Sequence, residues 1–185
     1  MSRPRNFDAH AVVDAAMQAL WAGGLAGTSV DDLLQATGLS RSSLYNSFGN
    51  REGLLAEAVQ RYADQQIAAV RRLFAKESLE QALSALLLDA ATSNHEGRGC
   101  LLVNAVGELH EQDGSTADVV RAAFARLAGA MEQAIRQVAP PGTDAAQLCA
   151  ALMASIAGMR TLQRAGLPLL QRQQAALRLA QALAS

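Results

Sequence analysis

Apolar residues recur along the chain with the spacing of α-helices, and glycines, prolines and capping residues interrupt this recurrence at short intervals. The first apolar stripe follows Asp8, a residue that favours the helix N-cap, and it ends at Gly23-Gly24. Phe7 and Val12 have the spacing of a hydrophobic staple across this helix start. Since no segment alternates like a β-strand and no segment repeats, the pattern predicts an all-α fold.

Two short helices are expected within residues 28–50. Ser29 begins the first of them, Asp32 stands where it completes a capping box, and Gly38 ends the helix. Ser40 caps the second helix, which ends at Gly49. Both helices are therefore delimited by local sequence signals.

A three-residue turn, Gly38-Leu39-Ser40, joins these two helices, and this length is typical of a helix-turn-helix motif. Gly38 supplies backbone freedom, and Leu39 fills the angle between the helices. The apolar side chains expected to form the shared core are Val30, Leu33, Leu39, Leu44 and Phe48. We interpret residues 1–50 as a helix-turn-helix domain and residues 51–185 as a larger second domain.

Helices are expected to fill the second domain. Asn50 caps a helix that reaches about Ala75. The helices expected beyond it cover residues 79–93, 100–112, 115–138, 144–166 and 168–185. Residues 100–112 begin almost without a polar face, which is typical of a helix buried in the middle of a bundle.

Two of these long helices predict a homodimer. The apolar stripe of residues 115–138 is wider than one neighbour can cover, and residues 144–166 are rich in alanine and glycine. Paired across a two-fold axis, these helices would form a four-helix interface.

The outward face of the helix after Ser40 has the chemistry of a major-groove reader. Arg41 can pair with guanine or phosphate, and Asn46 with adenine. Ser42 and Ser43 are small enough for close approach, and Tyr45 is long enough to reach a phosphate.

Helix N-termini nearby favour phosphate oxygens through their free N–H groups and dipoles. Ser29, or Thr28 before it, and Arg51 stand at such positions. The expected DNA-contacting set is Thr28, Ser29, Ser40, Arg41, Ser42, Ser43, Tyr45, Asn46 and Arg51.

Bulk charge does not point to nucleic acid, because the formal net charge is −1. Within the first 51 residues, the basic side chains are Arg3, Arg5, Arg41 and Arg51, and the acidic ones are Asp8, Asp14, Asp31 and Asp32. From the residues alone, an ordinary helical corner with a solvated polar face remains an alternative to a DNA-binding motif.

Residues 28–34, 38–45 and 48–55 resemble the DNA-binding signature of the TetR/AcrR family of transcriptional regulators. The resemblance is specific over about residues 8–60, and beyond them only the general plan is similar. It implies that residues 41–48 form the recognition helix and that Tyr45 and the residue at position 51 touch phosphates. Lysine is more usual than Arg51, and bulkier aromatic or histidine side chains are more usual than Asn46-Ser47.

The same resemblance implies a C-terminal domain that dimerises and binds a small-molecule effector. We expect a repressor that binds a double-stranded DNA operator and releases it when the effector binds, and activation instead of repression remains an alternative. The expected pocket residues are Cys100, Val103, Asn104, Phe124, Met131 and Met153. Asn104 is a polar amide in a mostly apolar helix, so it needs a partner, and this partner is either a ligand or a neighbouring helix. The methionines fit an adaptable pocket or plain core packing.

Cys100 is a second candidate trigger. It begins a helix, follows Arg98 and lies near His95, and this setting is typical of reactive thiols. The alternative is a small apolar residue packed in the core.

Other function classes lack their motifs in this sequence. Paired catalytic carboxylates, a nucleophile elbow, a phosphate loop and clustered metal ligands do not occur, so we expect neither an enzyme, a cofactor nor a metal site. The chain contains no uninterrupted apolar run of about 18–20 residues and no signal-peptide pattern, so we expect a cytoplasmic protein without a membrane span. The competing function is an all-α ligand-binding or redox-sensing protein that does not bind DNA.

Overall fold

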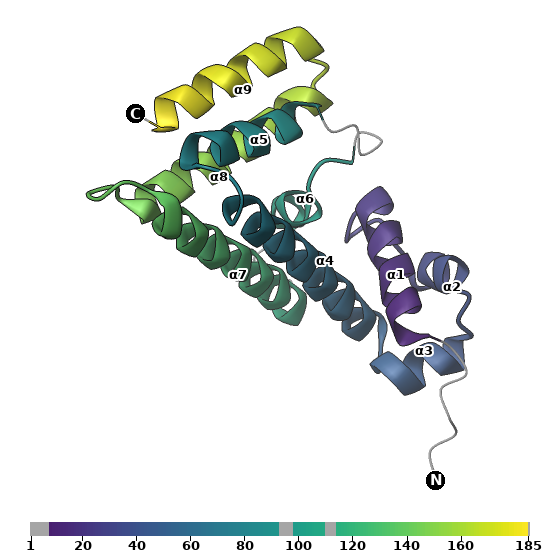
Figure 1. Cartoon of the computed structure of the whole chain (residues 1–185). Helices are drawn as coiled ribbons and strands as arrows, with labels where there is room; N and C mark the ends of the chain where they lie inside the picture. Colours follow the sequence, from purple (N-terminus) through teal and green to yellow (C-terminus); the bar gives the residue numbers. More distant parts are fainter. Residues whose placement is uncertain (1–7, 93–97, 110–113, 185) are drawn as a thin grey trace.

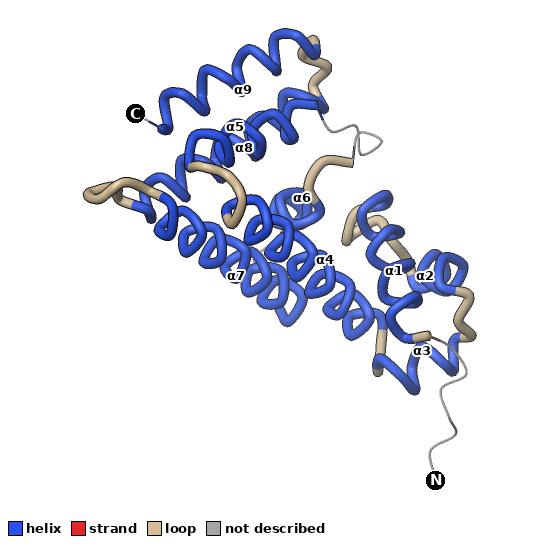
Figure 2. The backbone as a smooth tube through the Cα atoms, viewed as in Figure 1, coloured by secondary structure: helices blue, strands red, loops and turns tan. Residues whose placement is uncertain are grey.

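The computed structural model describes residues 8–92, 98–109 and 114–184, and every regular element in these ranges is a helix (Figure 1). The helices are α1 (Ala9–Gly23), α2 (Val30–Thr37), α3 (Arg41–Phe48), α4 (Arg51–Phe74), α5 (Leu79–Thr92), α6 (Leu101–Glu108), α7 (Gly114–Val138), α8 (Ala145–Arg164) and α9 (Leu169–Ala184). Figure 2 shows these helices joined by short loops, which confirms the all-α prediction. Phe7 and His95 lie outside the described residues.

The predicted capping residues define the starts of the first four helices. The side chain of Asp8 accepts a backbone N–H at the start of α1, and Asn50 does the same for α4. Ser29 and Asp32 form the expected capping box, because each side chain accepts from the other residue's backbone N–H. These contacts satisfy helix N–H groups that have no partner within the helix.

The long helices α4 and α7 pack side by side, and α1, α2 and α3 gather at one end of α4 (Figure 1). Helices α5, α8 and α9 pack together at the other end. The short helix α6 lies between the two groups and contacts both α4 and α7. A continuous apolar core extends from α1 to α9, so the group formed by α1, α2 and α3 is packed onto the rest of the molecule.

Helix α6 differs from the expectation for residues 100–112. It ends at Glu108, and it buries one face through Leu101, Leu102 and Ala105. Val106 on the opposite side is 42% exposed, so the helix is not buried all round. The reason is its position at the junction of the two helix groups, where a helix of this length has neighbours on one side and open space on the other.

The apolar stripe of α7 is covered within the same chain. Its residues Val120, Ala123, Met131 and Ile135 are buried, and α7 packs on α4 and α8. Helix α8 is different, because only about a third of its apolar stretch is buried and the rest is half-buried or exposed. On length and composition alone, α8 would also suffice to cross a membrane.

Candidate functional site

The motif between α2 and α3 has the geometry expected of a helix-turn-helix. Gly38 adopts φ 69°, a left-handed conformation that favours glycine, and its N–H donates to the Leu34 carbonyl over 2.9 Å. The Ser40 hydroxyl accepts the Ser43 N–H over 3.1 Å at the start of α3. Of the predicted motif core, Leu33, Leu39 and Leu44 are buried, whereas Val30 and Phe48 are half-buried.

One face of α3 is open to solvent. Arg41, Ser42, Tyr45 and Asn46 are exposed along it, and their spacing places them on the same side of the helix. Tyr45 is 46% exposed, which is unusual for a large aromatic side chain. Leu44 on the opposite side is fully buried. Packing therefore fixes the helix from behind and leaves these polar side chains free to meet a ligand.

Two of the predicted serines take part in the helix start. The hydroxyls of Ser42 and Ser43 lie 3.0 and 2.9 Å from the Ser40 hydroxyl. Ser43 is half-buried, so it supports the cap, whereas Ser42 stays on the exposed face.

Arg41 forms an ion pair with Asp31 of α2, at 2.5 Å between Nη2 and Oδ1. The two side chains are 56% and 80% exposed. Exposed pairs of this kind contribute about 0.2–1 kcal/mol, so a phosphate or a guanine edge can replace the carboxylate at small cost.

Thr28 and Arg51 are placed differently from the expectation that they face a phosphate. Thr28 is buried and donates its hydroxyl to the Gly24 carbonyl over 2.7 Å. Arg51 Nε donates to the Thr28 carbonyl over 2.9 Å, and its Nη2 donates to the Leu25 carbonyl. The guanidinium therefore ties the start of α4 to the loop between α1 and α2, because its fork satisfies two loop carbonyls at once.

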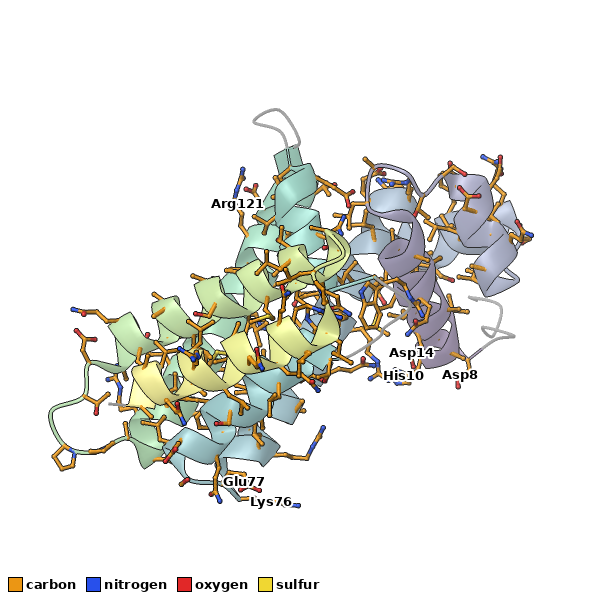
Figure 3. The ribbon with its side chains drawn as sticks, turned by 90° about the horizontal axis from the view of Figure 1, so that it is seen from above. Asp8, His10, Asp14, Lys76, Glu77 and Arg121 are labelled. Atoms are coloured by element: carbon orange, nitrogen blue, oxygen red, sulfur yellow. The ribbon has the colours of Figure 1, made fainter. Side chains whose placement is uncertain are left out.

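A second arginine joins α1 to α4. Arg61 Nε donates to Asp14 Oδ1 over 2.8 Å, and its Nη2 reaches Oδ2 over 3.1 Å. This hydrogen-bonded pairing holds the pKa of Asp14 below its usual value, with nearby His10 adding to the effect. Figure 3 shows Asp8 just before α1, and His10 and Asp14 on the first half of this helix.

Helix α6 is hydrogen-bonded at both of its ends to α1 or to the loop that follows α1. At its C-terminal end, Glu108 Oε2 accepts the Ala26 N–H over 3.0 Å, and a Cβ added at Gly24 would lie 2.7 Å from Glu108 Oε1. At its N-terminal end, Trp21 Nε1 of α1 donates to the Gly99 carbonyl over 3.0 Å. A displacement of α6 therefore strains contacts to α1 and to the loop that follows it.

Of the expected pocket residues, Val103 and Asn104 line a common cavity of about 310 Å³ between α6 and α8. Asn104 Nδ2 donates to the Arg98 carbonyl over 2.6 Å, and its Oδ1 accepts from Arg164 Nη1 over 2.8 Å. The amide therefore has partners within the chain, one of which lies on the neighbouring helix α8.

The remaining expected pocket residues do not line this cavity. Met131 is buried, and Phe124 and Met153 are partly buried against the core. Cys100 is half-buried at the N-cap of α6 and makes no capping hydrogen bond through its side chain. Tyr62 lies beside it, and burial is the main cause that raises the Tyr62 pKa, with the Cys100 thiol adding to the shift.

Exposed apolar residues gather on two neighbouring helices of the C-terminal group. We call this surface the α8–α9 face, and it comprises Ala154, Gly158, Leu162, Leu170 and Leu177. Leu170 is 65% exposed. Small residues on α8 allow a second helix to approach closely, and exposed leucines on α9 supply apolar area to be covered.

Sequence reasoning missed two residues of this region, Arg160 and Glu108. Arg160 lies on α8 with its side chain 10% exposed, and it pairs with Asp89 of α5. A charged residue inside the apolar run of residues 145–164 was the available signal, since charged side chains are seldom buried without a partner. Glu108 carries no such signal, because only the packing of α6 against the loop after α1 shows its role.

Comparison with known proteins identifies a family model and a relative that this chain matches. Residues 12–58 match the family model of the tetR family of bacterial regulatory proteins. The HTH-type transcriptional repressor ComR of Escherichia coli strain K12 is 33% identical over 174 residues, covering 89% of this chain and 83% of ComR.

Two solved structures are similar along almost the whole chain. One is a cysteine mutant of the TetR family transcriptional regulator CifR with 26 bp double-strand operator DNA, at 25% identity and a TM-score of 0.83, covering 97% of this chain and 99% of that chain. The other is FadR of Bacillus subtilis in complex with stearoyl-CoA, at 13% identity and a TM-score of 0.69, covering 94% of this chain and 97% of that chain. At this identity, the likeness to FadR concerns the fold alone.

Proposed function

Because this chain belongs to the TetR family of bacterial regulatory proteins, we propose that it represses transcription by binding operator DNA as a homodimer and releases the DNA when a small molecule binds. The family is one of regulators, which agrees with the expectation that the chain is not an enzyme. The observation that carries the proposal is the exposed face of α3, formed by Arg41, Ser42, Tyr45 and Asn46. We place the protein in the cytoplasm, where bacterial operators lie.

The proposed base-reading residues are Arg41 and Asn46, since their side chains match guanine and adenine edges in the major groove. Tyr45 and the N-cap residues Ser29 and Ser40 are the proposed phosphate contacts. Thr28 leaves the proposed set because it is buried, and Arg51 leaves it because loop carbonyls occupy its guanidinium.

The proposed dimer forms through the α8–α9 face instead of α7, whose stripe is already covered by α4 and α8. A test is Gly158→Arg, because a Cβ at Gly158 meets no atom of the described residues within 4 Å but would block a partner helix. We expect a dimer at micromolar concentration by light scattering, and a folded monomer for the variant. The matched control is Gly129→Arg on α7, which is also open and should remain dimeric. A monomeric parent, or a dimeric Gly158→Arg, would contradict this interface.

The proposed route from effector to DNA runs through α6. Its C-terminal Glu108 binds the loop after α1, and its N-terminal flank accepts a bond from Trp21. We propose a second conformation, in which α6 is displaced and the protein no longer fits the operator. An effector whose binding free energy favours this conformation by about 1–3 kcal/mol would lower the affinity for DNA roughly 5–150-fold. Reversible modification of Cys100, at the N-terminal end of α6, is an alternative trigger for DNA release.

The experiment that tests the function is a gel-shift titration with the intergenic DNA beside the protein's own gene. We expect a saturable complex on a near-palindromic site, with affinity that falls steeply as salt rises. Ser42→Glu should abolish the complex, because it sets a carboxylate against the DNA from an exposed position that does not affect packing. Gln133→Glu adds the same charge to an exposed site on α7 and should bind like the parent.

A parent protein that retards no upstream DNA would instead favour the competing function, an all-α ligand-binding or redox-sensing protein that does not bind DNA. Binding by Ser42→Glu with parental affinity would show that α3 is not the DNA-reading helix.

A further inference from the structure

The guanidinium of Arg160 is buried and incompletely bonded. Its Nη2 donates to Asp89 Oδ2 over 2.8 Å, while Nε and Nη1 are buried without a hydrogen-bond partner among the described residues. Leaving charged donors buried and unbonded is costly, and buried arginines normally have every nitrogen engaged. Nε and Nη1 of Arg160 therefore could each donate a hydrogen bond to a ligand.

A cavity beside Arg160 could hold a ligand that accepts these hydrogen bonds. Arg160 lines the cavity of about 310 Å³ between α6 and α8, together with Arg164 and Thr161 from α8. Val103 of α6 adds an apolar wall. The volume lies at the lower end of the range of small-molecule sites, so it fits a compact molecule rather than a long chain.

From this arrangement we infer that the cavity binds a small organic anion, a carboxylate or a phosphate monoester on a compact apolar body, as the effector of the proposed repressor. The inference rests on the proposed function for its regulatory meaning. Arg160 Nε and Nη1 are charged donors on different sides of the guanidinium, and each suits an oxygen of a carboxylate or a phosphate. Arg164 at the exposed rim adds a second guanidinium.

Two carboxylates lie near these arginines, and both are engaged elsewhere. Asp89 takes one nitrogen of Arg160 from the α5 side, and it is 57% exposed, so water also screens it. Glu108 lines the cavity, but its carboxylate accepts the Ala26 N–H and faces Gly24. Neither carboxylate therefore bonds Nε or Nη1 of Arg160.

The cavity also has a direct connection to the DNA-reading end. Arg164 bonds to Asn104, and Asn104 bonds to the Arg98 carbonyl. The Arg98 guanidinium lies over the Trp21 ring of α1, 5.2 Å from its centroid. An anion that draws Arg164 away from Asn104 would loosen this chain of contacts, which ends on α1, the helix that packs on α2 and α4.

The experiment is isothermal titration of the full-length protein with benzoate, phenyl phosphate and benzyl alcohol, which share a ring and differ in charge. We expect saturable binding of at least one anion and none of the alcohol. A preference between benzoate and phenyl phosphate separates a carboxylate from a phosphate ligand. If neither anion binds more tightly than benzyl alcohol, the inference is wrong.

Variants that weaken anion binding and a variant that strengthens it test the role of Arg160. Arg160→Met should weaken anion binding at least tenfold. Asp89, which loses its ion-pair partner in this variant, is exposed enough to be solvated by water. Asp89→Asn should strengthen binding several-fold, because a competing carboxylate is removed. Arg164→Gln, at the exposed rim, provides a variant that keeps the fold and should weaken binding several-fold. Arg136→Gln removes an exposed arginine of α7 and should change nothing.

Parental affinity in both Arg160→Met and Arg164→Gln would overturn the assignment. The anion-bound parent should also release operator DNA in the gel-shift assay. Calorimetric binding without an effect on DNA would refute the effector role, whereas failure of the unliganded protein to bind DNA would refute the proposed function and leave the calorimetric result standing.

Discussion

Arg41 on the DNA-reading helix and Arg160 in the C-terminal bundle each form an ion pair with one aspartate, at 2.5 and 2.8 Å. Arg41 and its partner Asp31 are both more than half exposed, whereas the Arg160 side chain is 10% exposed. The same interaction therefore has different consequences at the two sites. Water can replace either partner of the first pair, but nothing in the described structure replaces a lost partner of Arg160.

This difference separates the proposed DNA-binding surface from the proposed ligand cavity. An exposed arginine can exchange its carboxylate for a DNA phosphate or base at low cost, which suits rapid, salt-dependent association. A buried arginine with unbonded nitrogens gains most from a ligand that completes its hydrogen bonds, which suits discrimination between charged and neutral small molecules.

The largest expected difference between the two pairs is in stability. Asp89→Asn should lower the free energy of unfolding by about 3 kcal/mol, because it leaves Arg160 buried without a counter-charge. Asp31→Asn should lower it by less than about 1 kcal/mol. Urea denaturation followed by circular dichroism measures both. Equal losses in the two variants would show that the two ion pairs do not differ in their contribution to stability. Added benzoate should restore part of the loss in Asp89→Asn alone.

The next effect concerns DNA affinity. Arg41→Ala should cost about 1–3 kcal/mol of operator binding if Arg41 contacts a guanine, and should relax sequence preference at that base pair. Asp31→Ala should bind DNA more tightly, because it frees Arg41 and removes a negative charge beside the DNA. Gel-shift titrations against operator variants give both values. Weaker DNA binding by Asp31→Ala would mean that the pair positions Arg41 rather than competing for it.

Arg51→Ala should affect folding more than phosphate binding. We expect a loss of about 1–2 kcal/mol in unfolding free energy, because the Thr28 and Leu25 carbonyls lose their charged donor. The salt dependence of operator binding should not change. Arg51→Lys is the matched control, since it keeps the charge but not the fork. A salt slope reduced by about one, with parental stability, would instead make Arg51 a phosphate contact.

The smallest effect is a pH dependence at the α1–α4 junction. Because Arg61 lowers the pKa of Asp14 in the folded protein, this pair stabilises the fold above the ordinary carboxylate pKa of about 3.9. Its contribution is lost as the pH falls through the lowered value. Asp14→Asn should therefore cost about 0.5 kcal/mol at pH 7, and the difference from the parent should vanish in acid. A difference that persists at pH 2 in urea titrations would point to packing rather than to charge.

The helix-turn-helix could be predicted in detail because its signals are local. Ser29, Asp32 and Ser40 each bond within three residues of themselves, and Gly38 supplies its left-handed turn without help from distant residues. The exposed face of α3 then follows from helix periodicity once Leu44 is placed inside. These features depend on residues that are neighbours in the chain, so a short sequence window contains their cause.

The cavity and its connections could not be predicted in this way. Arg160 and Asp89 lie 71 positions apart, and Arg51 meets the Thr28 carbonyl across 23 positions. A sequence shows that a buried charge needs a partner, but the packing of α5, α6 and α8 decides which partner it has and which nitrogens stay unbonded. The sequence by itself thus determined the helices, most of their ends and the exposed polar face of α3, because those depend on short-range hydrogen bonds and periodicity. Only the tertiary structure decided that Thr28 is buried, that Arg51 binds loop carbonyls and that Arg160 faces a cavity, because burial and solvent access depend on how distant helices pack.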